Sequence, residues 1–88
     1  MAGYEVRVGA RAIKQLEGLP REAQRRVAEA LDGLAHEPRP RGGKHLAAAE
    51  DLWRIRVGVY RIVYAIEDER LLVLVVKVGH RRDVYRGL

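Results

Sequence analysis

Residues 52–64 read Leu-Trp-Arg-Ile-Arg-Val-Gly-Val-Tyr-Arg-Ile-Val-Tyr, and this stretch decides the fold. Large apolar residues alternate with arginines on both sides of Gly58, which is the two-residue period of a half-buried β-strand. Glycine at the first central position of a two-residue turn favours a type II′ hairpin. The sequence therefore predicts an antiparallel hairpin that turns at Gly58-Val59 and places Arg56 opposite Arg61.

This register gives the hairpin one apolar and one basic face. The apolar face, suited to lie under helices, carries Trp53, Ile55, Val57, Tyr60, Ile62 and Tyr64, and the opposite face carries Arg54, Arg56, Arg61 and Val63. Like charges directly opposite each other on two strands are destabilising. Two interpretations stay open at this point. The arginine stems cover a solvated strand face, or a bound phosphate relieves the repulsion, because arginine forks match its oxygens.

The segments around the hairpin predict the remaining elements. In chain order they are a strand over 4–8, a helix over 10–19, a second helix that starts at Pro20 and runs to Leu34, a loop over 38–44, and strands over 52–57, 59–66 and 71–78. The last run is almost continuously apolar, as in a central strand covered on both faces. The expected fold is one α+β domain over residues 1–88, with two layers: an N-terminal strand, a helical hairpin and a three-stranded antiparallel meander.

Composition excludes several kinds of chemistry. The 88 residues include no cysteine, serine or threonine, so disulfides, thiolate metal sites and serine or cysteine nucleophiles are ruled out. The net charge of +5 favours a polyanionic partner. Residues 1–37 hold six basic and six acidic side chains, whereas residues 38–88 hold eleven basic and six acidic ones. We expect a cytoplasmic protein with no membrane segment, because the longest apolar run is far shorter than the roughly 20 residues that span a bilayer.

The C-terminal residues bring further polar chemistry to the end of the last strand. His80, Arg81, Arg82 and Tyr85 follow Gly79, and a helix here would place Arg81 and Tyr85 one turn apart on the same side. A basic terminus by itself is usually a solvated tail. The three histidines lack the spacing of metal ligands, so we expect no metal and no cofactor.

Several of these motifs together resemble the RelE/ParE superfamily of toxin–antitoxin toxins. They are residues 52–64, the joint Leu19-Pro20, the run Pro-Arg-Pro-Arg-Gly-Gly-Lys-His-Leu over 38–46, and the sequence Val78-Gly79-His80-Arg81 with Tyr85, which is similar to the RelE branch. The resemblance implies the strand–helix–helix–meander fold. It also implies a ribosome-dependent endoribonuclease that cleaves mRNA in the A site, and a cognate RelB-like antitoxin with an acidic segment. A heterotetramer with this antitoxin is compatible with the resemblance.

The resemblance also implies roles for individual residues. Arg54 and Arg56 match basic positions of the family motif, Arg61 matches the arginine that stabilises the transition state, Arg81 matches the residue near the leaving group, and Tyr85 matches the C-terminal tyrosine that stacks on or activates the nucleotide. Some relatives carry lysine where this chain has Arg54 and Arg56. Arginine cannot give up its proton, which leaves His80 and Tyr85 as candidates for the general base. We expect Arg39, Arg41, Lys44, His45 and Arg82 to contact RNA or the ribosome.

Two other functions are compatible with the same fold. One is a ParE-like toxin that inhibits DNA gyrase by binding and cleaves no RNA. The other is a basic RNA-binding domain without catalytic activity. The arginine and tyrosine set argues against the ParE-like toxin, and fold alone does not separate the remaining functions, because function depends on the site.

Overall fold

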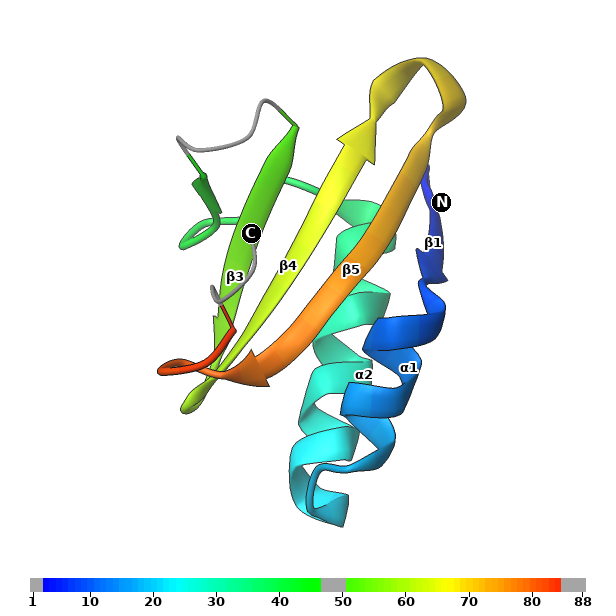
Figure 1. The fold of residues 1–88 in the computed structure, drawn as a ribbon. Helices are drawn as coiled ribbons and strands as arrows, with labels where there is room; N and C mark the ends of the chain where they lie inside the picture. The colour runs from blue at the N-terminus through cyan, green and yellow to red at the C-terminus, as the bar shows by residue number, and fades with distance from the viewer. Residues whose placement is uncertain (1–2, 47–50, 85–88) are drawn as a thin grey trace.

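The computed structural model describes residues 3–46 and 51–84 of the chain. The elements are β1 (Glu5–Val8), α1 (Ala10–Glu17), α2 (Arg21–His36), β2 (Lys44–His45), β3 (Leu52–Val57), β4 (Tyr60–Glu67), the 3₁₀ helix η1 (Asp68–Arg70) and β5 (Leu72–His80). The five strands form one sheet in the order β1-β5-β4-β3-β2, in which β1 runs parallel to β5 and the other neighbours are antiparallel. Both helices cover the same face of the sheet (Figure 1). The predicted α+β fold is confirmed.

The β3–β4 hairpin has the predicted register. Arg56 lies opposite Arg61 and Trp53 lies opposite Tyr64. Gly58 has a φ of 61°, a left-handed conformation that the first position of a type II′ turn requires and that glycine adopts without strain. This turn sets the phase of both strands, and hence which side chains face the helices.

The apolar core lies between the helices and the sheet. Its fully buried members include Val27 of α2, Ile62 and Tyr64 of β4, and Val75 of β5. These are the apolar positions that the helical and two-residue periods predict. We call the other side of the sheet, opposite the helices, the open face.

The joint between the two helices differs by one residue from the prediction. Pro20 has extended backbone, with ψ at 150°, so it precedes α2 and the helix begins at Arg21. The carbonyl oxygen of Pro20 still accepts the first helical hydrogen bond, at 2.9 Å from the amide nitrogen of Gln24. The Gln24 side-chain amide donates to the carbonyl oxygens of Glu17, at 3.1 Å, and Leu19, at 2.9 Å. The Gln24 amide therefore satisfies the end of α1 from the first turn of α2.

Strand β5 is an inner strand of the sheet, as predicted, but in the described part of the chain helices cover only one of its faces, where the sequence predicted cover on both. Both helices lie on one face, and Leu74 and Val76 on this strand are only half-buried. The strand also contains a β-bulge. Tyr64 pairs with Val75 and the preceding residue, Val63, pairs with Lys77, so Val76 is an extra residue in β5.

The sequence predicted a loop over all of residues 38–44, but the last of these residues belongs to a strand. Lys44 and His45 form the short strand β2, in which Lys44 pairs with Arg54 and His45 pairs with Trp53. Two residues are too few to show a strand period in the sequence. Neither helix of the described residues is long and apolar enough to cross a membrane.

Candidate anion-binding face

Basic side chains from four strands share the open face. In one row across the sheet, Lys44 of β2 pairs with Arg54 of β3, Arg54 pairs with Val63 of β4, and Val63 pairs with Lys77 of β5. Paired residues point to the same side of a sheet. In the next row on this face, Arg56 pairs with Arg61 and Arg61 pairs with Gly79. The strands thus bring these cations together at one end of the open face.

Acidic side chains on the open face lie at its other end. Glu5 of β1 and Glu67 of β4 both pair with Leu72, at the start of β5. Glu5 is already engaged, because its carboxylate accepts a hydrogen bond of 2.6 Å from Arg7 Nε. Among the described residues, none of Arg54, Arg56 and Arg61 forms a salt bridge. Within residues 3–46 and 51–84, these three arginines therefore have no carboxylate partner.

The guanidinium of Arg61 is held in place by the hairpin turn. Its Nη1 donates to the carbonyl oxygens of Gly58, at 3.2 Å, and Tyr60, at 3.0 Å. Arg61 is only 9% exposed. A buried arginine whose Nη1 donates to two backbone carbonyl oxygens has a defined orientation.

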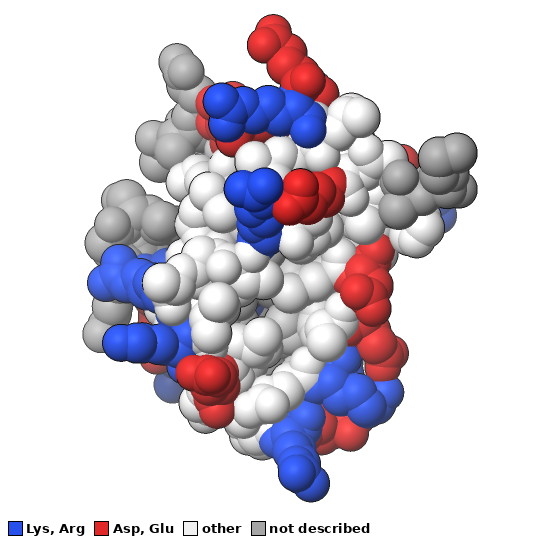
Figure 2. Space-filling model, turned by 90° about the vertical axis from the view of Figure 1, so that its right-hand side faces the viewer, with Lys and Arg blue, Asp and Glu red and all other residues white. Residues whose placement is uncertain are grey.

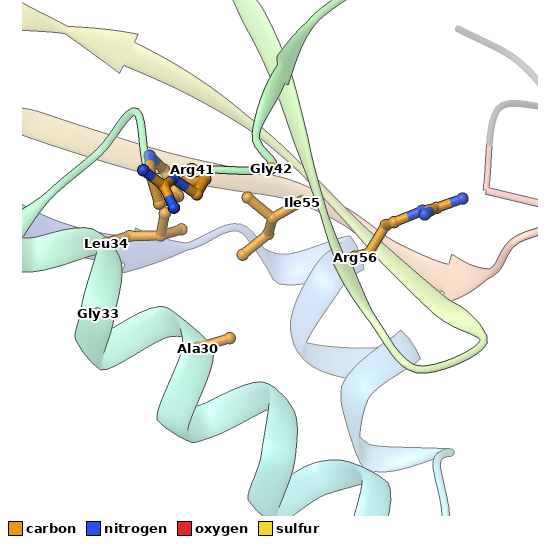
Figure 3. A pocket seen from close by; sticks show the side chains of 8 residues that line it. Ala30, Gly33, Leu34, Arg41, Gly42, Ile55 and Arg56 are labelled. Atoms are coloured by element: carbon orange, nitrogen blue, oxygen red, sulfur yellow. The ribbon is translucent and has the colours of Figure 1, made fainter.

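Arg54 contributes a polar atom without a partner. Its Nη1 is buried and forms no hydrogen bond within the part of the chain that the structure describes. Leaving a charged donor unsatisfied in this way is costly, and such groups in folded proteins usually have a ligand, water or ion. Arg56 differs, since its side chain is exposed. Figure 3 shows Ile55 directed toward α2 and Arg56 directed to the opposite side of β3.

The C-terminal segment folds back onto the same end of the open face. Residues 81–84 form turns where a helix was considered, with the amides of Asp83 and Val84 donating to the His80 carbonyl oxygen at 2.9 and 3.0 Å. The Arg81 amide donates to the Val59 carbonyl oxygen at 2.8 Å. Val84 is buried against Gly79, where an added Cβ would lie 3.7 Å from its Cα. Val84 therefore packs against the sheet at Gly79.

Two side chains of this segment have defined surroundings. His80 lies edge-on to Tyr60, with ring centroids 6.3 Å apart, and its Nδ1 accepts a hydrogen bond of 3.2 Å from the amide of Arg82. The side chains of Arg81 and Arg82 are exposed beside it. Tyr85 lies outside the described residues.

The other predicted RNA contacts are divided between two sides of the sheet. Lys44 shares the open face with Arg54, whereas His45 lies beside Trp53, with ring centroids 5.3 Å apart. Arg41 lines a pocket of about 290 Å³ between α2 and β3, away from the side to which Arg56 points (Figure 3). Arg39 forms a salt bridge of 2.8 Å with Asp68.

The Arg39–Asp68 pair is electrostatically well defined. Arg39 Nη1 and Nη2 donate to the two Asp68 oxygens at 3.1 and 2.8 Å, and the Tyr4 hydroxyl donates to Asp68 Oδ1 at 2.6 Å. These hydrogen bonds, that from Arg39 first, lower the pKa of Asp68 to about 2. The guanidinium of Arg39 also lies 5.3 Å from the centre of the Trp53 ring. Arg39 therefore binds Asp68 and lies against Trp53, and it does not belong to the group of basic side chains on the open face.

Sequence reasoning missed Lys77. This lysine lies inside the apolar run of β5, and simple alternation puts it on the same side as Val73 and Val75, facing the helices. The bulge at Val76 reverses that phase and turns Lys77 to the open face, where it is 8% exposed. A single charge within an apolar strand was the available signal, but the side to which the Lys77 side chain points depended on the bulge.

No group of three or more metal-ligating side chains occurs among the described residues.

On the side of the molecule that carries β1 and α1, charges of both signs are mixed. Figure 2 shows acidic and basic side chains interspersed there around a central area without charged side chains. On α2, for example, Arg25 forms ion pairs with Glu22 and Glu29. This pattern is that of a solvated surface, and it contrasts with the basic end of the open face.

Comparison with known proteins agrees with this architecture. The family model described as the ParE toxin of the type II toxin–antitoxin system parDE matches residues 6–85. Toxin RelG of Mycobacterium tuberculosis is 34% identical over 84 residues, which is 94% of this chain and 97% of that protein. The archaeal RelE–RelB complex from Pyrococcus horikoshii contains a chain with a TM-score of 0.81 and 30% identity, covering 93% of this chain and 99% of that one.

A second solved complex is similar. The RelBE2 toxin–antitoxin complex of Mycobacterium tuberculosis matches with a TM-score of 0.79 and 35% identity, over 90% of this chain and 99% of that one. The likeness therefore extends over nearly the whole length of both chains, in sequence as well as in fold. The chain belongs to the RelE/ParE superfamily of toxins of type II toxin–antitoxin systems, as residues 52–64 and the Gly79-His80-Arg81 motif predicted.

Proposed function

We propose that this toxin is a ribosome-dependent endoribonuclease that cleaves mRNA in the A site, in the cytoplasm where translation takes place. The observation that carries the proposal is the group of arginines on the open face. Arg54, Arg56 and Arg61 lie on adjacent strands without a carboxylate partner among the described residues, and Arg54 Nη1 is buried and unsatisfied. A phosphodiester supplies the oxygens that such a group requires.

The RNA itself provides the nucleophile in this mechanism. The chain has no serine, threonine or cysteine, so the ribose 2′-hydroxyl attacks the adjacent phosphorus and the 5′-oxygen of the next nucleotide leaves. Negative charge builds up on the phosphorane oxygens. The fixed guanidinium of Arg61 stabilises that charge, assisted by Arg54 and Arg56, while Arg81 lies near the leaving group. Preorganised donors of this kind act mainly on the transition state.

Two protons must also move, one from the 2′-hydroxyl and one to the leaving oxygen. Because Nδ1 of His80 accepts the Arg82 amide hydrogen, a neutral imidazole carries its proton on Nε2. In this arrangement neither ring nitrogen of the neutral imidazole has a vacant lone pair for the proton of the 2′-hydroxyl, which disfavours His80 as the base. Tyr85 is then the stronger candidate for the base.

A second function has one observation in its favour. The matching family model is that of ParE toxins, so inhibition of DNA gyrase by binding is the alternative. The two functions make opposite demands on Arg61, because a nuclease requires it for chemistry and a binding inhibitor does not.

Mapping of mRNA ends in a reconstituted translation system tests the proposal. We expect cuts at A-site codons that require ribosomes, and Arg61→Ala to slow cleavage by about 10²–10³-fold, as the loss of one preorganised donor does in other enzymes. Arg11→Ala, which removes an exposed arginine from α1, is the matched control and keeps full activity. Intact mRNA together with inhibited supercoiling by gyrase contradicts the nuclease and supports the alternative.

We also propose a cognate antitoxin that neutralises the basic surface. The similar chains from Pyrococcus horikoshii and Mycobacterium tuberculosis are in complexes described as RelE–RelB and RelBE2. An acidic RelB-like segment complements the open face electrostatically, and two copies of each chain would form a heterotetramer. Co-expression with the antitoxin of the same operon, followed by mass measurement, gives the stoichiometry. Purification of the toxin without a bound partner from that strain argues against the pairing.

A further inference from the structure

Lys77 is one of two buried charged side chains in the described part of the chain, and the other is Arg61. Both belong to the open face. Arg61 pairs with Gly79 and Val63 pairs with Lys77, so Arg61 and Lys77 are diagonal neighbours on β4 and β5. Diagonal neighbours on one face lie about 7–8 Å apart, within reach of long side chains. The two buried cations thus lie next to each other on the open face, on neighbouring strands.

The position of Lys77 depends on a specific feature of the backbone. Val75 pairs with Tyr64 on the helix side, and without the extra residue Val76, Lys77 would point to that side as well. Bulges often lie next to active sites, where they redirect a side chain. Here the bulge costs ladder hydrogen bonds, and its result is to place a positive charge on the open face instead of in the apolar core.

The surroundings of Lys77 indicate what it would contact. Val63 separates it from Arg54, whose Nη1 is buried and unsatisfied. Gly79, next to Lys77 on this face of β5, has no side chain, and the buried Val84 packs against it. Arg54, Arg61 and Lys77 therefore surround Val63 from three strands, with positive charge on each side of it.

We propose that Lys77 contacts the phosphodiester of bound RNA together with Arg54 and Arg61, and that the bulge at Val76 exists to deliver it there. This inference rests on the proposed function. Lys77 supplies charge at the phosphate, and Arg61 supplies oriented donors. If Lys77 only supports the fold, its replacement changes stability but removes no phosphate contact, which makes the two roles separable by experiment.

Lys77→Met removes the charge and keeps most of the stem, and Lys14→Met makes the same change at an exposed position on α1. Single-turnover cleavage on mRNA-programmed ribosomes is measured against toxin concentration. We expect Lys77→Met to lower the maximal rate about tenfold or more, the usual effect of losing a charge-assisted hydrogen bond, while Lys14→Met matches the wild type. Equal rates for the two variants overturn the proposal and leave the nuclease function intact.

Binding of a 2′-O-methyl RNA octamer, which has no 2′-hydroxyl to react, gives a readout that does not depend on cleavage. Affinity is measured over a range of salt concentrations. We expect the slope of log K against log salt to fall by about 0.7 in Lys77→Met, because one phosphate contact on a single strand is lost. An unchanged slope contradicts the contact even where ribosomal cleavage is absent in every variant, so failure of the inference and failure of the nuclease proposal are distinguishable.

Lys77→Arg and Lys77→Gln complete the series. Arginine keeps the charge and is expected to retain most of the cleavage rate, whereas glutamine, of similar length, is expected to be as slow as methionine. If Lys77→Arg is as slow as Lys77→Met, the charge is not what matters and the proposal is overturned in favour of proton transfer by the lysine amine. Thermal unfolding identifies variants that fail to fold, and Lys77→Gln then replaces Lys77→Met in both assays.

Discussion

The hydroxyl of Tyr64 is a buried polar group on the helix side of β4. It donates a hydrogen bond of 2.8 Å to the carbonyl oxygen of Pro38, and the side chain is fully buried. Pro38 begins the segment that leads from α2 to β2. The Tyr64 hydroxyl therefore holds the segment between α2 and β2 to the middle of the sheet. Burial raises the pKa of Tyr64 to about 12.

We expect Tyr64→Phe to lower the free energy of unfolding by about 1–2 kcal/mol, because the Pro38 carbonyl is left without its donor in a buried site. Urea unfolding at neutral pH measures this difference. Tyr60→Phe is the control, since the Tyr60 hydroxyl has no hydrogen-bond partner within the described residues. Equal losses in the two variants would show that the hydrogen bond is not the cause.

The same residue predicts a response to alkaline pH. The pKa of Tyr64 is raised in the folded protein from 10.0 to about 12, so the unfolded state loses this proton first. The stabilisation from keeping Tyr64 neutral is complete below pH 10 and is lost as the pH rises toward 12. We expect the difference in unfolding free energy between wild type and Tyr64→Phe to shrink over this range. A constant difference from pH 8 to 12 would contradict the assignment.

At the scale of elements, the β3–β4 hairpin links stability to the candidate site. Its turn residue Gly58 has a φ of 61°, and an added Cβ would lie 3.2 Å from Nη1 of Arg26 on α2. The carbonyl oxygen of the same residue accepts a hydrogen bond from Arg61. The conformation of Gly58 thus determines both the shape of the turn and the position of the carbonyl oxygen that orients Arg61.

Gly58→Ala is expected to reduce the free energy of unfolding by about 1–2 kcal/mol, the cost of a left-handed conformation for a residue with a Cβ. Gly33→Ala is the matched control. Gly33 lies within α2 with nothing near its added Cβ, so the same change there is expected to raise stability by about 0.5–1 kcal/mol. Urea unfolding measures both variants. Equal signs for the two substitutions would contradict the argument from backbone conformation.

These elements also show how far the sequence alone could predict the site. The hairpin register was predictable, because a glycine at the turn and strict alternation determine which side chains share a face. Lys77 was not, because a bulge reverses alternation without any local sequence signal as strong as the turn glycine. The pairing of Lys44 with Arg54 was missed for another reason, since β2 is too short to show a period. The roles of Arg54, Arg56, Arg61, His80, Arg81 and Tyr85 remain predictions.

At the scale of the whole molecule, one polar cluster joins distant parts of the chain. Tyr4 precedes β1, Arg39 lies between α2 and β2, and Asp68 follows β4. The hydrogen bonds from Tyr4 and Arg39 to Asp68 connect all three at the edge of the fold away from the hairpin turn. The cluster therefore holds three segments of the chain together at the end of the sheet away from Arg54, Arg56 and Arg61.

We expect acid to weaken the interactions of Asp68 with Arg39 and Tyr4. The pKa of Asp68 is lowered from 3.8 to about 2 in the folded protein, so its stabilising contribution is present above pH 4 and is lost as the pH falls toward 2. We expect Asp68→Asn to lose this share of the acid dependence in thermal unfolding between pH 5 and 2. Glu69→Gln, a neighbouring exposed carboxylate, is the control and should retain the wild-type profile. Identical profiles for all three proteins would contradict the role of Asp68.

The parallel pairing of β1 with β5 has a consequence for how the chain folds. Glu5 of β1 pairs with Leu72 of β5, which is far away in the sequence, whereas Val57 and Tyr60 pair across the two-residue turn of the β3–β4 hairpin. Contacts between residues far apart in sequence form more slowly than local ones. We therefore expect the hairpin that carries Arg54, Arg56 and Arg61 to form before β1 pairs with β5.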